Sequence, residues 1–385
     1  MESMIGLLTF HWADDYGAML QAYALKRSLE KAGGKVEIIP YAPYRLAGRY
    51  RWFFPEYRIC DGRVTFLPRK SINKWRRNLF PDKVFFRRRR AMAQFRRRYL
   101  TTCMPLHRVQ SISLKRYSRV FVGSDQVWNP DITLGLDDAY IGNIPGRNGC
   151  PFISYAASLG GTDLPAEYRE KFSACVGASF TDISLREPGA VPFVEKLLGR
   201  PVTDTLDPVL LLTREEWQEI AVAPAETDYI LLYQTENNRQ LLDCAHRAAE
   251  QLKKSIVSVN YYRHGRSAPS WLETRGGIGP AQFLGYIRDA SCVITNSFHG
   301  TAFSILFEKP FIVFPHSTRN ARIDGLLEKS GLGSRLVKEN SLLTDKMIQA
   351  PVDWPDVSKR LAADRERSAT FIRRNIDGGK SAWQP

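Results

Sequence analysis

The sequence predicts an α/β protein of two Rossmann-like, doubly wound domains with a cleft between them. Short apolar runs alternate with helical patterns along most of the chain, which is typical of parallel sheets covered by helices. A basic, aromatic segment over residues 45–100 interrupts this alternation once. The dipeptide Asp207-Pro208 then separates two series of alternating elements. Because ligands of such folds bind beyond the carboxyl ends of the strands, the strand-to-helix turns are where a site is expected.

The first domain is expected over residues 1–205. Residues 5–10 predict a strand, 18–29 a helix that ends at Gly33-Gly34, and 36–39 a second strand. These elements form a β-α-β unit, so the sheet is expected to be parallel. Further strands are expected at residues 119–123, 152–156 and 182–186. The segment 45–100 is expected to be a mostly helical insertion in this domain.

The second domain is expected over residues 206–350, and a charged helix within 351–385 is expected to pack back on the first domain. The predicted strands of the second domain are 229–233, 255–259, 292–295 and 311–314. Its predicted helices are 239–253, 281–289 and 301–307, and the last helix is 357–376.

Composition narrows the class of protein. The chain has 385 residues, of which 44% are hydrophobic and 25% charged, as in ordinary folded proteins. No apolar run is long enough to span a membrane, and the N-terminus lacks the features of a signal peptide, so a cytoplasmic protein is expected. The six cysteines have no disulfide or metal-site spacing, so no metal is expected. No cofactor is expected either. Phosphate-loop, zinc-protease, hydrolase-elbow and dinucleotide motifs are also missing.

The net charge of +15 indicates an anionic partner. Thirteen basic residues lie between Arg69 and Arg98, with only Asp82 to oppose them. Helical spacing places Phe85, Met92, Phe95 and Tyr99 on one face. No nucleic-acid module accompanies the charge, so a solvated face or docking on an anionic membrane is expected rather than nucleic-acid binding. The arginines expected in such docking are Arg87, Arg88, Arg89 and Arg90, together with Arg96, Arg97 and Arg98.

The most distinctive motif follows the predicted strand 292–295. Ser297, His299, Gly300 and Thr301 lie where that strand gives way to a helix. The amides of a helix N-terminus favour phosphate or carboxylate, and histidine can transfer protons near neutral pH. The alternative is an ordinary helix cap formed by Ser297 or Thr301.

A second motif, residues 122–129, also follows a buried strand. Ser124 allows close backbone approach beside Gly123, and Asp125 can bind sugar hydroxyls or act as a base. Trp128 offers an apolar face to a sugar ring. The alternative is a turn with an Asp cap and a packed tryptophan.

Three arginines are candidates for gripping an anion. Arg186 lies at a predicted strand end, where it can hold phosphate or carboxylate through two parallel hydrogen bonds. Arg319 and Arg322 follow a strand of the second domain. The alternatives are an internal ion pair for Arg186 and a solvated helix start for the other two.

Several of these pieces together resemble the polysaccharide pyruvyltransferase family. The matching segments are residues 16–25, 123–129, 154–160, 184–187, 207–208, 295–304, 309–311 and 320–323. Asp15 stands where relatives often have asparagine before Tyr16-Gly17. The resemblance implies a GT-B-like pair of domains, phosphoenolpyruvate as donor, and two sugar hydroxyls as acceptor. The product would be a pyruvate ketal on a glycan or an undecaprenyl-diphosphate-linked oligosaccharide.

The resemblance also distributes roles among the candidate residues. Catalysis is expected of His299 as acid, of Asp125 as orienting group or base, and of Arg186. Donor binding is expected of Ser297, Gly300, Thr301, Lys309, Arg319 and Arg322. Acceptor binding is expected of Tyr16, Gly17, Ser124, Trp128 and Asn129.

Two other functions compete with this one. A GT-B glycosyltransferase would hold the diphosphate of a nucleotide sugar with His299, Arg322 and the helix end. A non-catalytic protein that binds nucleic acid or membranes would account for the charge but leave the polar turns without a role.

Overall fold

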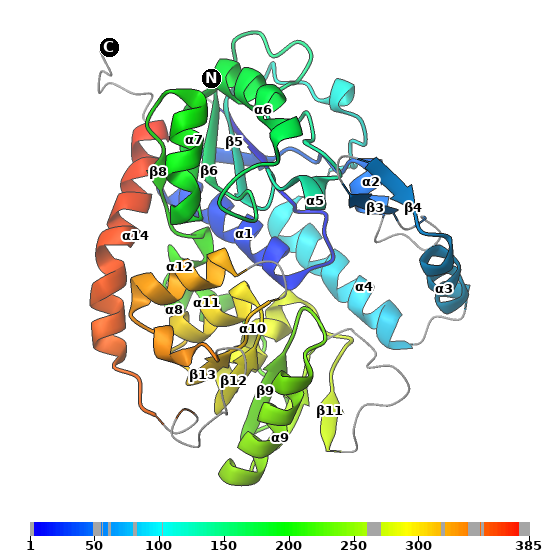
Figure 1. The fold of residues 1–385 in the computed structure, drawn as a ribbon, viewed down its shortest axis with the longest axis vertical. Helices are drawn as coiled ribbons and strands as arrows, with labels where there is room; N and C mark the ends of the chain where they lie inside the picture. The colour runs from blue at the N-terminus through cyan, green and yellow to red at the C-terminus, as the bar shows by residue number, and fades with distance from the viewer. Residues whose placement is uncertain are drawn as a thin grey trace. The chain divides into compact units, whose positions relative to one another are not determined.

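The computed structural model describes residues 4–48, 55, 57–60, 63–79, 83–101, 103–259, 271–316, 320–337, 347 and 350–376 (Figure 1). It divides into two compact units. Unit 1 comprises Met1–Pro81, Arg96–Leu211 and Asp364–Pro385, and unit 2 comprises Asp82–Phe95 and Leu212–Ala363.

Unit 1 contains a parallel sheet of six strands. Their order is β2 (Lys35–Ile38), β1 (Met4–Leu8), β5 (Tyr117–Asp125), β6 (Phe152–Ala157), β7 (Phe180–Leu185) and β8 (Thr203–Asp204). All six residues of β6 are buried, as a central parallel strand covered on both faces requires. A two-stranded antiparallel hairpin, β3 (Tyr57–Cys60) with β4 (Arg63–Phe66), lies outside this sheet.

The helices of unit 1 connect its strands. They are α1 (Tyr16–Lys31), α2 (Tyr44–Ala47), α3 (Pro68–Leu79), α5 (Pro130–Thr133), α6 (Ala166–Ser179) and α7 (Val191–Leu198), with a π-helical turn, η2, at Arg96–Leu100. Helix α1 begins at Asp15, whose carboxylate accepts from Ala18 N at 2.9 Å. Because aspartate and asparagine cap helices equally well, the Asp15 difference from relatives preserves this turn.

Unit 2 contains a parallel sheet of five strands. Their order is β11 (Leu272–Thr274), β10 (Ser255–Ser258), β9 (Tyr229–Tyr233), β12 (Cys292–Thr295) and β13 (Phe311–Val313). Its helices are α4 (Lys83–Phe95), α8 (Arg214–Ile220), α9 (Arg239–Leu252), α10 (Pro280–Asp289), α11 (Phe298–Leu306) and α12 (Ala321–Ser330). Two parallel sheets with helical connections confirm the predicted α/β class of two Rossmann-like units.

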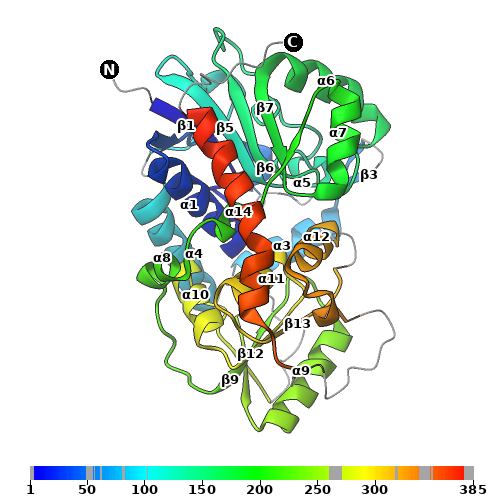
Figure 2. The same cartoon turned by 90° about the vertical axis from the view of Figure 1, so that its left-hand side faces the viewer.

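Helix α14 (Trp354–Ile376) begins in unit 2 and ends in unit 1 (Figure 2). From Asp364 onward it belongs to unit 1, where Ser368 Oγ accepts from Leu206 N at 2.9 Å. Arg374 in its last turn forms an ion pair with Asp182 at 2.8 Å.

The division of the chain differs from the expected one at two places. The join falls after Leu211 rather than after residue 205, because Pro208–Leu210 forms a buried turn within unit 1. The segment expected as one insertion, 45–100, is divided between the units. Its α4 packs on the start of α10 in unit 2, where a Cβ at Gly279 would lie 2.9 Å from Ala91 Cβ.

Candidate active site

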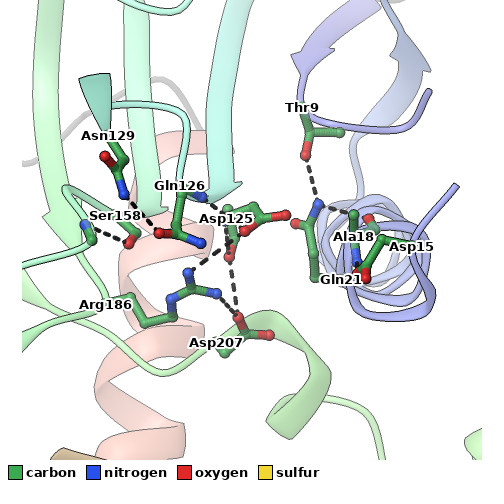
Figure 3. Close-up of polar contacts among 12 residues, drawn as sticks. Thr9, Asp15, Ala18, Gln21, Asp125, Gln126, Asn129, Ser158, Arg186 and Asp207 are labelled. Atoms are coloured by element: carbon green, nitrogen blue, oxygen red, sulfur yellow. Dashed lines mark hydrogen bonds and ion pairs between the residues drawn. The ribbon is translucent and has the colours of Figure 1, made fainter. Parts of the chain in front are cut away.

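The carboxyl edge of the unit 1 sheet carries a cluster of charged side chains (Figure 3). Asp125 is the last residue of β5, Arg186 follows β7, and Asp207 follows β8. Their strands are neighbours or near neighbours in the sheet, so their ends meet at one edge. All three side chains are buried, with residue exposures of 8%, 5% and 1%.

Arg186 lies at the centre of this cluster. Its Nη1 donates to Asp207 Oδ2 at 2.6 Å, and its Nη2 lies 3.7 Å from Asp125 Oδ1. Burial alone would lower the pKa of Arg186, but the charges of Asp207, Glu187 and Asp125 outweigh it and raise that pKa. The guanidinium is therefore a permanent buried cation.

The loop after β5 is shaped to hold Asp125 in place. Asp125 has φ of 71°, in the left-handed region that aspartate tolerates better than most residues. Its Oδ1 accepts from Gln126 N at 2.8 Å, and its own N–H donates to Ser124 Oγ at 2.6 Å. Ser124 Oγ also lies 3.3 Å from Asp207 Oδ2, so the loop is joined to the same cluster.

The turn between β1 and α1 belongs to the same edge. Tyr16 and Gly17, expected to bind acceptor, form the buried first turn of α1. His11 is buried and its Nδ1 lies 3.1 Å from the Thr9 carbonyl oxygen. Burial lowers the pKa of His11 to about 4, and the nearby charge of Arg96 acts in the same direction, while the bond to Thr9 opposes them.

In unit 2 the corresponding edge carries the His299 motif. Helix α11 begins at Phe298 instead of residue 301, so His299 lies in its first turn rather than before it. Ser297 is the N-cap, and its Oγ accepts from Gly300 N at 3.3 Å. The Thr301 hydroxyl donates to the Ser297 carbonyl oxygen at 3.0 Å. His299 is buried, with 7% of its surface exposed.

Helix α12 brings a cation to the start of α11. The Arg322 guanidinium lies over the Phe298 ring at 5.7 Å, and that ring contacts the His299 ring at 5.2 Å. Arg322 and His299 are thus joined through one aromatic side chain. Arg319, expected to assist them, lies outside the described residues.

The loops after β9 and β13 complete this edge. Asn296 accepts from Thr235 N at 2.8 Å and donates to the Glu236 carbonyl oxygen at 3.1 Å. His316 Nδ1 lies 3.6 Å from Glu236 Oε1, and both side chains are partly exposed. A partly exposed imidazole and carboxylate therefore accompany the helix N-terminus.

Comparison with known proteins identifies the family of the chain that carries these two sheet edges. The model of the polysaccharide pyruvyl transferase family matches residues 15–318, which include Asp125, Arg186, Asp207 and His299. The chain belongs to the polysaccharide pyruvyl transferase family. It is therefore a transferase of polysaccharide pyruvylation, and the resemblance noted in the sequence is confirmed. A search of curated protein sequences finds no match to the chain.

Several solved structures are similar to this chain at low sequence identity and with TM-scores under 0.5. UDP-GlcNAc 2-epimerase from Methanocaldococcus jannaschii, in complex with UDP-GlcNAc and UDP, is 12% identical with a TM-score of 0.46, covering 98% of this chain and 99% of its own. Glycosyltransferase SsfS6 from Streptomyces sp. SF2575, complexed with thymidine diphosphate, is 14% identical with a TM-score of 0.47, covering 98% and 100%. UDP-N-acetylglucosamine 2-epimerase from Rickettsia bellii is 11% identical with a TM-score of 0.45, covering 98% and 99%.

One acceptor assignment in this pyruvyl transferase, that of Trp128, is wrong. Trp128 is fully buried between Phe172 and Phe180, with ring centroids 5.0 and 5.5 Å away, and its Nε1 donates to the Tyr140 carbonyl oxygen. It packs in the core of unit 1 and offers no face to a sugar. Asn129 caps α5 and donates to Gln126 Oε1 at 2.8 Å, so its amide holds the loop together.

The donor assignment of Lys309 is also wrong. Lys309 follows α11 and immediately precedes β13, whereas Ser297 and His299 are at the start of α11. A helix of nine residues spans about 13 Å, so these positions lie at opposite edges of the parallel sheet. Lys309 is at the amino edge, where burial lowers its pKa.

Arg96 does not belong to an exposed membrane-facing set. Its guanidinium donates to the carbonyl oxygens of His11 and Trp12 at 3.0 and 3.1 Å and to Asp14 Oδ1 at 2.9 Å. Arg96 therefore braces the β1–α1 turn from within unit 1. Arg97 and Arg98, the next two residues, are exposed.

Several residues of the two edges carried no usable signal in the sequence. Asp207 was noted only as part of a domain join, although it holds Arg186. Gln21 looked like one more residue of an amphipathic helix. The network partners that only the structure reveals are Asp207, Gln21, Glu236 and His316.

Among the described residues, no group of three or more His, Cys, Asp or Glu side chains could hold a metal ion. No helix that the structure describes is long and apolar enough to cross a membrane.

Proposed function

We propose that this pyruvyl transferase moves the enolpyruvyl group of phosphoenolpyruvate onto two hydroxyls of a sugar, forming a pyruvate ketal and releasing phosphate. The acceptor is a polysaccharide or lipid-linked oligosaccharide precursor. The observation that carries the proposal is the buried Arg186, held by Asp207 beside Asp125 at the carboxyl edge of the sheet. A fixed cation next to a carboxylate suits a reaction in which a hydroxyl loses its proton.

The donor requires cations and amides for its phosphate and carboxylate. In unit 2 the first turn of α11 and the Arg322 guanidinium meet this requirement, since helix N-termini and arginine both favour such anions. Ser297 and Gly300 set the course of this turn. Thr301 supports it through its bond to the Ser297 carbonyl oxygen rather than through a free hydroxyl.

The chemistry divides into two additions. His299 gives a proton to C3 of the enol phosphate, while a sugar oxygen attacks C2 and Asp125 takes that hydroxyl's proton. The C2–O bond to phosphate then breaks, and phosphate leaves with its bonding electron pair. The second hydroxyl attacks C2, gives its proton to the released phosphate, and closes the ketal ring.

Acceptor-dependent release of phosphate from phosphoenolpyruvate tests the proposal. Wild-type protein is expected to release one phosphate for each ketal detected by NMR of the acceptor, and His299→Gln is expected to lose at least a hundredfold in kcat. His246→Gln, at a half-exposed histidine on α9, is the matched control and keeps its activity. If His299→Gln is folded and turns over at a near-normal rate, His299 is not the general acid.

The peripheral membrane location expected of an enzyme with a lipid-linked acceptor rests on α4. Residues 83, 86, 87 and 90 share one exposed face of this helix, and they are Lys, Phe, Arg and Arg. Phe86 is 49% exposed and Val84 38%, among exposed arginines. Apolar side chains beside cations suit the surface of an anionic membrane.

Sedimentation with phosphatidylglycerol-containing vesicles tests this docking. Replacing Phe86, Arg87 and Arg90 with Ser, Gln and Gln should release most of the protein into the supernatant, while a Gln94→Ala control should not. If the triple variant and the wild type sediment equally, α4 does not dock on the membrane and its basic residues form a solvated face.

A further inference from the structure

The buried glutamine of the first helix, Gln21, faces the charged cluster of unit 1. It lies on α1 with none of its surface exposed. Figure 3 shows its amide pointing toward Asp125. No step proposed above uses this side chain.

The orientation of the Gln21 amide is determined by its neighbours. Its Nε2 donates to the Ala18 carbonyl oxygen at 2.9 Å and to Thr9 Oγ1 at 2.8 Å. Because a carbonyl oxygen only accepts, the amide atom beside Ala18 must be the nitrogen. Both N–H groups are then used, and Oε1 is the end that faces Asp125.

Gln21 Oε1 is buried and has no hydrogen-bond partner among the described residues. A buried acceptor left in this state costs about 1–3 kcal/mol, so native proteins rarely keep one without a ligand or a water to satisfy it. An ionised carboxylate is also an acceptor and cannot fill this need. Whatever lies between Gln21 and Asp125 must therefore donate a hydrogen.

We infer that Gln21 is a positioning residue for the acceptor, whose Oε1 accepts a hydrogen bond from the sugar when Asp125 holds the reacting hydroxyl. This inference rests on the proposed function. Asp125 keeps 8% of its surface exposed, so the hydroxyl reaches the pair from the Asp125 side. The reacting hydroxyl gives its single hydrogen to Asp125, so the donor to Gln21 Oε1 is a neighbouring hydroxyl of the same sugar, and the two contacts together fix the ring for attack on C2.

The test uses the full-length protein, phosphoenolpyruvate, and a panel of methyl hexopyranosides and polyprenyl-diphosphate-linked hexoses. Gln21→Met keeps the length of the side chain and removes the amide. We expect the acceptor KM to rise roughly five- to tenfold, the loss of one neutral hydrogen bond, with the phosphoenolpyruvate KM unchanged and kcat within about twofold. A merely structural role would change kcat and the melting temperature instead of one KM.

Two further variants keep the inference falsifiable. Thr9→Val removes one partner of Nε2 and should raise the same KM by a smaller factor, which serves if Gln21→Met does not fold. Ser28→Ala removes another buried hydroxyl of α1, about 10 Å further along the helix, and should leave every KM unchanged.

The outcomes separate the inference from the function on which it rests. If wild-type protein releases no phosphate with any acceptor, the proposed function fails and the inference fails with it. If the wild type is active and both Gln21→Met and Thr9→Val keep its acceptor KM, the function stands and the inference is overturned, leaving a buried water as the partner of Oε1.

Discussion

At the scale of single residues, Arg186 shows what a buried charge requires. Its side chain is 2% exposed and that of Asp207 is fully buried, with 2.6 Å between their charged atoms. Without Asp207, the buried Arg186 charge keeps only the Asp125 carboxylate at 3.7 Å and the nearby charge of Glu187, and it loses its closest ion pair. We therefore expect Asp207→Asn to lower the free energy of unfolding of unit 1 by about 3 kcal/mol, measured by urea titration. Arg374→Ala, which breaks the exposed pair with Asp182, should cost less than about 1 kcal/mol.

His11 should make stability depend on pH. Burial lowers its pKa in the folded protein to about 4, whereas an unfolded histidine has a pKa near 6.5. Between these values the unfolded chain binds the extra proton, so stability falls as the pH is lowered from 6.5 to 4. The wild type should lose about 2 kcal/mol from this group between pH 7.5 and pH 5.

His11→Asn keeps a donor for the Thr9 carbonyl oxygen but cannot titrate. Urea titrations of this variant at the two pH values should show that the loss assigned to His11 has disappeared. If both proteins lose the same stability on acidification, His11 is not the group responsible.

The sequence predicted that Asp125, Arg186 and His299 lie at the carboxyl edges of the sheets, because a polar side chain directly after a buried strand must lie there. The same logic could not find Asp207 or Gln21, since their partners are distant in sequence and neither residue type is unusual where it stands. The prediction that the Trp128 ring faces a sugar was wrong for a different reason. A tryptophan near a polar turn has the same appearance in sequence whether its ring faces solvent or the core.

At the scale of elements, the start of α11 depends on close packing at Gly300. A Cβ there would lie 2.5 Å from Thr295 Oγ1, which accepts from Ser297 N at 3.0 Å. Gly300→Ala should therefore shift the first turn of α11 and reduce kcat about a hundredfold, as misplacement of catalytic groups does. The double variant with Thr295→Ala should recover part of this loss, because the colliding hydroxyl is gone. The steric explanation would be contradicted if steady-state kinetics showed that the loss of kcat in the double variant equals the combined losses of Gly300→Ala and Thr295→Ala.

Two neighbouring arginines at the end of the basic segment should behave differently. Arg96 makes three hydrogen bonds with the β1–α1 turn, one of them charged, whereas Arg97 is exposed. Arg96→Ala should lower the free energy of unfolding by about 2 kcal/mol, and Arg97→Ala by less than about 0.5 kcal/mol. If urea titration gave the same loss of unfolding free energy for both variants, Arg96 would behave like an exposed arginine and would not stabilise the β1–α1 turn.

Short apolar runs made the buried strands predictable, as the agreement at β9 and β12 shows. Helix boundaries were less predictable. Helix α11 begins three residues before its expected start, because Ser297 caps a first turn that the spacing of apolar residues does not indicate. The assignment of α4 to unit 2 depends on small residues of a distant segment, Gly277 and Gly279, which no local pattern connects to it.

At the scale of the whole molecule, the choice between phosphoenolpyruvate and a nucleotide sugar can be made by ligand-linked stability. A ligand that binds only the folded protein stabilises it by about 2.7 kcal/mol at 100 times its Kd. For units of this size that corresponds to roughly 5–10 °C in Tm. We expect such a shift with phosphoenolpyruvate, and its loss in Arg322→Gln, because the guanidinium beside Phe298 and the α11 N-terminus are the proposed donor site. Arg239→Gln, at a 94% exposed side chain on α9, should keep the full shift. A shift with UDP-hexoses and none with phosphoenolpyruvate would contradict the proposed donor and favour a glycosyltransferase, since the same helix end and arginine would then hold a diphosphate.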